Sequence, residues 1–397
     1  MTGNSPPKLA EFVVIVALLM SVVAFSTDAM LPSFPQITAD LHLENANQAQ
    51  LVITVFILGT GIGQLFFGPL SDGLGRKPAI GAGLVVFTIG CLICLYADSL
   101  KWVLIGRLVQ GLGVSAARTV TTALVRDLYE GRAMARVMSF AFGIFILVPA
   151  VAPSVGQLIM GAFGWRSIFV SFIIYATFTW GWMFLRLAET HPPERRFTLE
   201  PAAFISAVKE VLTNRTVFTF IVIQGLLLGG LFAYLSSTQQ IFVDSFGVGD
   251  KFPLYFALIA LASALASFIN GTLVMRIGMR RMCEISFGLA AISAGLSLLF
   301  QSIAPNTWLL VGFTLWSALG FLFMGISLGN VNALAMETMG HISGLAAAII
   351  GSVSTLIAVV LAIPIGLAFN GTPIPLITAN MALYTLAFVL MIRENAA

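Results

Sequence analysis

The sequence has few charged side chains, and this scarcity decides its class. Only 9% of the 397 residues are Asp, Glu, Lys or Arg, whereas 58% are hydrophobic. Soluble globular domains carry about 25% charged residues. The composition therefore excludes a soluble globule and favours a protein that lies in a membrane.

Cysteine and histidine are also scarce. The three cysteines lie in or at the end of apolar runs, and the three histidines lie outside such runs: Cys91, Cys94, Cys283, His42, His191 and His341. An odd number of cysteines gives no disulfide framework, and an intramembrane hydrolase would need a nucleophile with its base or a metal cluster within the apolar runs. No phosphate-binding glycine loop is present. We expect no enzyme activity, no metal, no cofactor and no nucleic-acid partner.

Long apolar runs are what the sequence has in abundance. Twelve of them approach the ~20 residues that cross a bilayer, at about 12–31, 51–67, 79–97, 102–124, 138–162, 167–187, 216–243, 253–275, 283–303, 308–333, 343–369 and 375–392. We predict an all-α membrane protein with twelve transmembrane helices in two six-helix bundles, 1–187 and 216–397. The polar segment 188–215 is the expected cytoplasmic linker, with a short amphipathic helix at about 201–212.

The basic residues predict the orientation of these helices. Fifteen of the twenty Lys and Arg fall in loops on one side, and only Lys101, Arg166 and Lys251 fall on the other. Cytoplasmic loops carry the excess of basic residues. Both termini are therefore expected in the cytoplasm, in a multi-pass protein of the bacterial inner membrane.

The two halves of the chain repeat each other. A shift of 203 residues sets Gly68 on Gly271 and Gly75 on Gly278, while Asp72 meets Met275. Such internal repetition supports a chain built of two related halves. The second half has kept the two glycines of the first half but has no counterpart of the charged residue Asp72.

Three charged residues lie inside apolar runs: Asp28, Arg107 and Arg118. Each costs ~2.5 to 3.5 kcal/mol at a bilayer centre, so such residues usually mark a partner or a pathway. A rise of 1.5 Å per residue places Asp28 and Arg107 at similar depths, roughly 9 Å to the outer side, where they could meet. Asp28 is alternatively an interfacial residue that reaches water beside Pro32, and Arg118 could equally snorkel to the inner surface.

Uncharged polar residues in the second half are candidates for a substrate cavity beside many Phe and Met side chains. They are Tyr234, Gln239, Gln240, Asn270, Asn330 and Asn332, with Arg118 added from the first half. A large apolar cavity with few directional groups suits lipophilic substrates. Each residue taken alone is alternatively a helix-packing residue.

A polar turn, G-P-L-S-D-G-L-G-R-K-P at 68–78, separates the second and third runs. It resembles the loop G-x-L-[AS]-D-R-x-G-R-K of the major facilitator superfamily, with a glycine where the family usually has its first Arg. The resemblance implies a gating role for Gly68, Asp72, Gly75, Arg76 and Lys77, in which the Asp caps a neighbouring helix and pairs with basic residues. Asp127, in R-D-L-Y-E-G-R, belongs to the same implied gate.

Two further segments resemble motifs of this superfamily. R-L-V-Q-G-L-G supplies Arg107, Gln110, Gly111 and Gly113 of the fourth-span motif R-x-x-Q-G-x-G, whose Arg is linked to proton transfer. The fifth span is similar to the antiporter motif G-P-x-x-G-G, but only Pro153 and Gly156 match. These residues still permit a bend and close helix packing.

Segments along nearly the whole chain resemble one branch, the bicyclomycin and chloramphenicol resistance group of drug:proton antiporters. They are D-A-M-L-P-S-F-P, R-D-L-Y-E-G-R-A-M-A-R and G-W-R-S-I-F-V. The resemblance implies efflux of small amphiphilic compounds by alternating access, driven by the proton gradient, with Asp28 as the proton carrier. We expect a monomer whose partners are the substrate, protons and lipid. The alternative is a substrate-specific proton-coupled carrier, either a metabolite exporter or a symporter.

Overall fold

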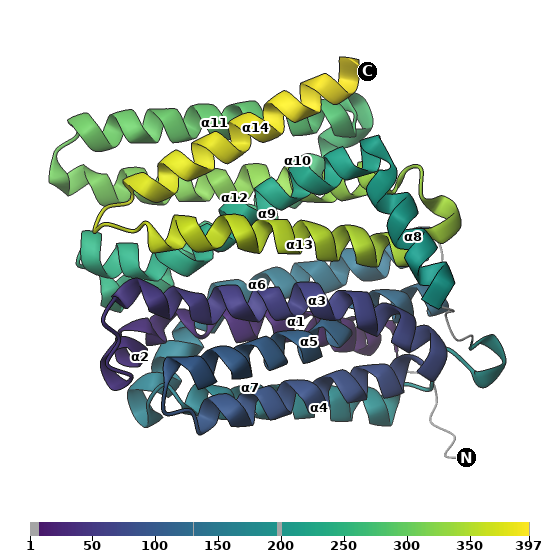
Figure 1. Ribbon diagram of the computed structural model, residues 1–397. Coiled ribbons are helices and arrows are strands. Elements are labelled where there is room, and N and C mark those ends of the chain that lie inside the picture. The colour runs from purple at the N-terminus through teal and green to yellow at the C-terminus, as the bar shows by residue number, and fades with distance from the viewer. Residues whose placement is uncertain (1–7, 130, 197–200, 397) are drawn as a thin grey trace. The chain divides into compact units, whose positions relative to one another are not determined.

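The computed structural model describes residues 8–129, 131–196 and 201–396 (Figure 1). These ranges are almost entirely helical and contain no β-strand. Because a backbone that crosses lipid must satisfy its own hydrogen bonds, helices are the expected solution for so apolar a chain. The prediction of an all-α membrane protein is confirmed.

Twelve helices in the described ranges are long and apolar enough to span a membrane. They are α1 (Leu9–Asp28), α3 (Leu51–Leu74), α4 (Arg76–Leu95), α5 (Leu100–Leu128), α6 (Gly131–Phe163), α7 (Ser167–Arg186), α9 (Arg215–Gln240), α10 (Phe252–Ile277), α11 (Met279–Ile303), α12 (Asn306–Met336), α13 (Ser343–Leu367) and α14 (Ile374–Ala396). Each predicted span corresponds to one of these helices.

Two shorter helices complete the fold. The helix α2 (Phe34–Asp40) follows α1 after a 3-10 turn at Leu31–Ser33, and α8 (Pro201–Thr213) lies where an amphipathic helix was expected. On α8, Ala207 and Val211 are buried, while the opposite side of the helix is exposed. A single π-helical turn, Ile241–Ser245, continues α9.

The chain divides into two compact units. The first takes in the chain up to Leu43 together with Val55–Ser206, and the second takes in Glu44–Thr54 together with the chain from Ala207 onward. The division falls within α8, and the first turn of α3 groups with the second unit. The domain boundaries expected from the sequence stay a prediction.

The turn predicted at 68–78 is shorter than the sequence suggested. Helix α3 continues through Gly68 and Asp72 to Leu74, and the chain reverses only at Gly75, whose φ is +103°. Its counterpart in the internal repeat, Gly278, has a φ of +85° and also precedes a helix, α11. Side chains rarely adopt this conformation, so glycine is favoured at both positions. The sequence alignment of the two halves therefore marks two equivalent helix starts.

Small residues hold α4 close to α5 in the first unit. A Cβ at Gly83 or Gly113 would collide with the backbone of the opposite helix. A Cβ at Gly90 would likewise collide with the backbone nitrogen of Gln110. The outward side of α4 is a stripe of exposed apolar residues, including Val85 and Ile89. Exposed apolar stripes of this length on a spanning helix face lipid.

Candidate functional site

Asp28 ends α1 in the first unit and is buried, with 4% of its surface exposed. Among the described residues, none donates a hydrogen bond to its carboxylate. An unpaired buried carboxylate is rare because its charge is expensive to remove from water. The alternative interpretation, a carboxylate reaching water beside Pro32, does not fit this burial.

Arg107 is completely buried on α5. Its Nη1 donates to Oε1 of Gln110 at 2.9 Å, its Nη2 donates to the carbonyl oxygen of Ser26 at 3.1 Å, and its guanidinium stacks over the ring of Phe56 at 4.2 Å. The expected meeting with Asp28 takes a different form. The side chain of Arg107 contacts the backbone of α1 at Ser26, two residues before Asp28. No ion pair joins the side chains of Arg107 and Asp28.

The other residues of the fourth-span motif position Arg107. Gln110 accepts from the guanidinium and donates from Nε2 to Sγ of Cys91 on α4 at 2.9 Å. Gly111 packs against the backbone carbonyl of Phe56 on α3, and Gly113 packs against the backbone of Phe87 on α4. The motif thus brings three helices together around one buried cation.

The fifth-span residues pack next to Asp28. Pro153 and Gly156 are buried on α6, and a Cβ at Gly156 would collide with the carbonyl of Ala29, the residue after Asp28. This close approach requires a residue without a side chain. The partial antiporter motif therefore fixes α6 against the end of α1 that carries the buried carboxylate.

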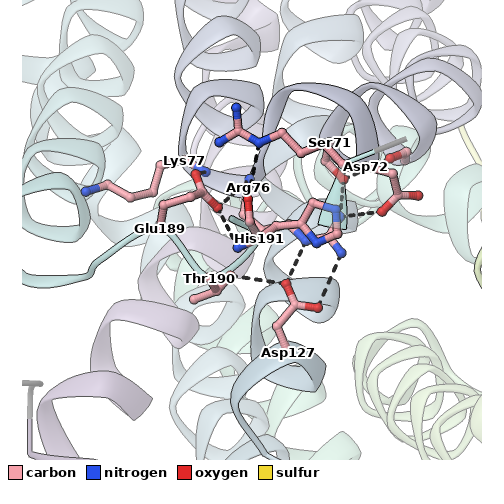
Figure 2. A network of polar contacts seen from close by, with 10 residues as sticks. Ser71, Asp72, Arg76, Lys77, Asp127, Glu189, Thr190 and His191 are labelled. Atoms are coloured by element: carbon pink, nitrogen blue, oxygen red, sulfur yellow. Dashed lines mark hydrogen bonds and ion pairs between the residues drawn. The ribbon is translucent and has the colours of Figure 1, made fainter. Parts of the chain in front are cut away.

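The predicted gating residues form a network around Arg76 (Figure 2). Arg76 is 3% exposed, and its Nη1 donates to Oδ1 of Asp72 at 2.6 Å and to Oγ of Ser71 at 2.8 Å. Its Nε donates to Oδ2 of Asp127 at 2.8 Å, an oxygen that also accepts from the hydroxyl of Thr190. Two carboxylates from α3 and α5 thus neutralise one buried cation at the start of α4.

Glu189 is a member of this network that the sequence did not reveal. Its carboxylate accepts from the backbone N–H groups of Arg76 at 2.9 Å and Lys77 at 3.0 Å, which caps the start of α4. The resemblance assigned capping to Asp72, and the structure corrects this, because Asp72 bonds the side chain of Arg76 instead. Nζ of Lys77 donates to the carbonyl of Leu187, the residue that follows α7, and in Figure 2 the side chain of Lys77 points away from the side chain of Arg76.

Tyr234 lies in an aromatic group of the second unit. It is buried, and its ring centroid is 5.3 Å from Phe321 and 6.4 Å from both Phe313 and Trp316. Its hydroxyl is buried close to the side chains of Ser317 and Thr238. A small cleft between α9, α12 and α14 is lined by Tyr234, Trp316 and Asn380, among others. The part of Tyr234 in substrate binding stays a prediction.

Gln240 was predicted to line the cavity, but its side-chain amide is hydrogen-bonded to two other side chains. Its Nε2 donates to Oδ1 of Asn47 at 2.9 Å, and its Oε1 accepts from Nε2 of Gln50 at 2.9 Å. Asn47 also donates to the carbonyls of Leu367 and Phe369 at the end of α13. We call Asn47, Gln50 and Gln240 the polar clasp. It fastens the start of α3 to α9 and α13.

The remaining cavity candidates do not form one constellation. Asn330 donates from Nδ2 to Oδ1 of Asn270 at 2.8 Å, which links α12 to α10. Gln239 is buried, whereas Asn332 is exposed. Arg118 is exposed on α5 in the first unit. Their predicted part in substrate binding stays a prediction.

The cysteines serve helix packing. Cys91, Cys94 and Cys283 are free and buried, and Sγ of Cys94 donates to the carbonyl of Val103 on α5. In the described ranges, no group of three or more His, Cys, Asp or Glu residues could hold a metal ion.

Comparison with known sequences gives the relatives of this chain. The family model described as Major Facilitator Superfamily matches residues 16–390. The bicyclomycin resistance protein homolog of Haemophilus influenzae is 29% identical over 291 residues, 73% of each chain. The multidrug resistance protein MdtL of Salmonella heidelberg is 32% identical over 293 residues, 72% of each chain.

Solved structures share the fold. The partially occluded, inward-open xylose transporter XylE from E. coli superposes with a TM-score of 0.77 at 14% identity, over 97% of each chain. The human organic anion transporter MFSD10 superposes with a TM-score of 0.69 at 18% identity, over 97% of this chain and 100% of the MFSD10 chain. Together, the family match, the relatives and the twelve helices confirm the resemblance seen in the motifs: this chain belongs to the Major Facilitator Superfamily of membrane transporters.

Proposed function

We propose that this protein is a drug:proton antiporter that exports small amphiphilic compounds by alternating access. The relatives named for bicyclomycin and multidrug resistance cover about three quarters of the chain and support this substrate class. The proposal includes a monomer that needs no cofactor and uses the proton gradient as its energy source.

The observation that carries the proposal is the carboxylate of Asp28, which is buried and accepts no hydrogen bond from the residues that the structure describes. An ionised carboxylate is costly in apolar surroundings without a partner, so its protonation depends on whether water can reach it. In an alternating-access cycle, Asp28 would take a proton from the acidic side as the exported substrate leaves. Loss of that proton on the inner side would restore substrate binding.

Arg107 couples this group to the helix bundle. Its guanidinium holds the backbone of α1 at Ser26 and the side chain of Gln110. A shift of α1 against α5 would change the distance between this fixed cation and Asp28. Since opposite charges nearby favour the ionised carboxylate, such a shift would convert helix movement into binding or release of a proton.

Two groups of contacts are suited to act as gates. The network around Arg76 fastens the start of α4 to α3 and α5, and the polar clasp fastens the start of α3 to α9 and α13. The charge distribution of the loops assigns the first gate to the cytoplasmic side and the clasp to the outer side. Alternating access requires that one gate opens while the other holds.

The test uses purified protein reconstituted in liposomes with a pH gradient imposed in either direction. An antiporter accumulates a lipophilic cationic dye or chloramphenicol against an opposed proton flux, and adding the compound to protein in weakly buffered detergent releases protons. Uptake in the same direction as the protons would identify a symporter. Transport of one metabolite and of no drug would replace the proposal with a substrate-specific carrier.

A further inference from the structure

A cavity of about 530 Å³ lies in the first unit, beside the start of α4 and the end of α7. Its apolar wall is formed by Pro78, Gly81, Ala82, Trp180 and Phe184. Ligand pockets in proteins typically measure about 300 to 1,000 Å³. This cavity therefore has the size of a ligand site, and of the residues that line it only Lys77 and Glu189 belong to the network around Arg76.

The helices on either side of the cavity present apolar surfaces. On α4, Val85 is 61% exposed and Ile89 is 49% exposed, and on α7, Ile174 is 64% exposed and Phe178 is 57% exposed. Surfaces of this kind on spanning helices lie against acyl chains. The cavity is therefore continuous with the lipid-facing side of the first unit, at the end of α4 where the basic residues lie.

One end of the cavity is cationic. Nζ of Lys77 donates to the carbonyls of Phe184 at 2.8 Å and Leu187 at 2.6 Å, which uses two of the three N–H groups of an ammonium. Nε of Arg196 donates to the carbonyl of His191 at 3.2 Å, and its two terminal nitrogens have no acceptor among the described residues. The cavity thus has donors left for an anionic ligand.

The acidic residue at this end of the cavity, Glu189, already accepts hydrogen bonds from the backbone. The carboxylate of Glu189 accepts from three backbone N–H groups, those of Arg76, Lys77 and His191. The two cations Lys77 and Arg196 therefore outnumber the one carboxylate among the residues that line the cavity. An acidic headgroup placed there would meet a net positive charge.

Trp180 provides a second indication of a missing partner. Its Nε1 is buried and has no acceptor among the described residues, and the indole nitrogen lies directly over Gly81. A buried donor without an acceptor is destabilising, because the donor has lost its hydrogen bonds to water. A ligand that supplies an oxygen to this wall of the cavity would remove that cost.

We propose that this cavity is a binding site for one anionic phospholipid. The phosphate lies between Lys77 and Arg196, where charge-assisted hydrogen bonds form, and an acyl chain follows the wall made by Gly81 and Ala82 into the bilayer. Basic pockets between spanning helices suit such headgroups. Because Lys77 and Glu189 also hold the start of α4, the bound lipid stabilises the closed network around Arg76.

The experiment measures which lipid the purified full-length protein retains. Protein in mild detergent is incubated with equal amounts of phosphatidylglycerol and phosphatidylcholine, and native mass spectrometry counts the bound lipids. Phosphatidylglycerol is expected to predominate. Arg196→Gln is expected to lower its retention about five-fold, the usual share of one basic residue near an acidic lipid. Ala82→Leu fills the apolar wall and is expected to lower retention without changing charge.

The matched control is Arg136→Gln, which removes an exposed arginine from α6 in the same unit. It is expected to retain phosphatidylglycerol like the wild type. Equal retention of the two lipids by the wild type, or unchanged retention by both Arg196→Gln and Ala82→Leu, overturns the proposal. Displacement of the lipid by millimolar inorganic phosphate also overturns it, because the site then recognises a free anion. Thermal unfolding of each variant excludes misfolding as the cause.

Discussion

Nη2 of Arg107 donates to the backbone carbonyl of Ser26 at 3.1 Å, which joins the N-terminal half of α5 to the last turn of α1. Asp28 lies two residues further along that turn. A carbonyl near the end of a helix has no partner within the helix, so a side-chain donor there adds a bond that α1 could not make itself. The guanidinium is therefore bonded to the backbone of α1 two residues before Asp28, and this bond does not involve the carboxylate.

Arg107→Lys tests whether the shape of the guanidinium matters or only its charge. Lysine keeps the charge but lacks the planar fork that reaches Ser26 and Gln110 together. Losing one hydrogen bond to a charged group costs about 1.5 to 3 kcal/mol, so transport should fall about ten-fold or more. Drug transport by reconstituted protein measures this. Full activity of the lysine variant would show that charge alone suffices.

Most of the fold could be predicted from the sequence, because each span must satisfy its own backbone and bury its apolar side chains in lipid or against neighbours. The ninth run was expected at about 283–303, and α11 is Met279–Ile303. The glycine pair Gly75 and Gly278 followed from the internal repeat. The motif residues Arg76 and Asp127 also lie together, as the resemblance implied.

The contacts that the sequence did not reveal join residues far apart in the chain. Glu189 caps α4 from 113 residues beyond Arg76, and Asn47 reaches the carbonyl of Leu367 across 320 residues. No local period or spacing marks such partners. The pairing expected between Asp28 and Arg107 failed for a related reason: depth along two helices does not fix which way each side chain turns.

Asp127→Asn is expected to impair the protein more than Asp72→Asn. Asp127 gives Arg76 two contacts, at 2.8 and 3.3 Å, and also accepts from Thr190, whereas Asp72 gives one contact at 2.6 Å and is 30% exposed. Without the charge of Asp127, the buried guanidinium of Arg76 keeps only the more exposed Asp72 as an ion-pair partner, and breaking one side of a buried ion pair is destabilising. The unfolding temperature in detergent should fall further for Asp127→Asn.

Substrate affinity provides the control for this gate. Both variants should bind substrate within a few-fold of the wild type, because the network lies at the start of α4 and away from Asp28. A loss of affinity beyond ten-fold in a folded variant would place the network in the substrate site.

Gln240→Leu is expected to open the polar clasp. It removes the donor to Asn47 and the acceptor from Gln50, which frees the start of α3 from α9. Ala49 lies between Asn47 and Gln50 of the clasp and is 1% exposed. Ala49→Cys, in a protein from which the three native cysteines have been removed, serves as the reporter. Labelling by an impermeant maleimide should become faster. Gln224→Leu, in the same helix, is the matched control, and equal labelling rates in both variants would argue against a clasp.

The orientation of the chain makes a separate prediction. The loop before α5 is expected outside and the segment after α7 inside, so Asp98→Cys should react with an impermeant reagent in intact cells while Glu194→Cys should not. Both positions are exposed, so a difference in labelling reports the side of the membrane. Labelling of Glu194→Cys before cell lysis would reverse the assignment of the termini to the cytoplasm.

Asp28→Asn should abolish proton coupling and leave the fold intact. The amide keeps the shape of the carboxyl group, and a charge that costs ~2.5 to 3.5 kcal/mol at the bilayer centre is gone, so insertion and unfolding temperature should be unchanged or improved. Arg107 keeps its contacts with Ser26 and Gln110, so the helices stay in place. Substrate should then bind with little dependence on pH, and active efflux should stop.

The measurement is substrate-induced proton release from purified protein in weakly buffered detergent, compared between the wild type and Asp28→Asn. Asp40→Asn is the matched control, because Asp40 is exposed at the end of α2 and pairs with Arg166 and Trp165. It should release protons like the wild type. Undiminished release from Asp28→Asn would mean that another group carries the proton, and the mechanism proposed for Asp28 would then be wrong.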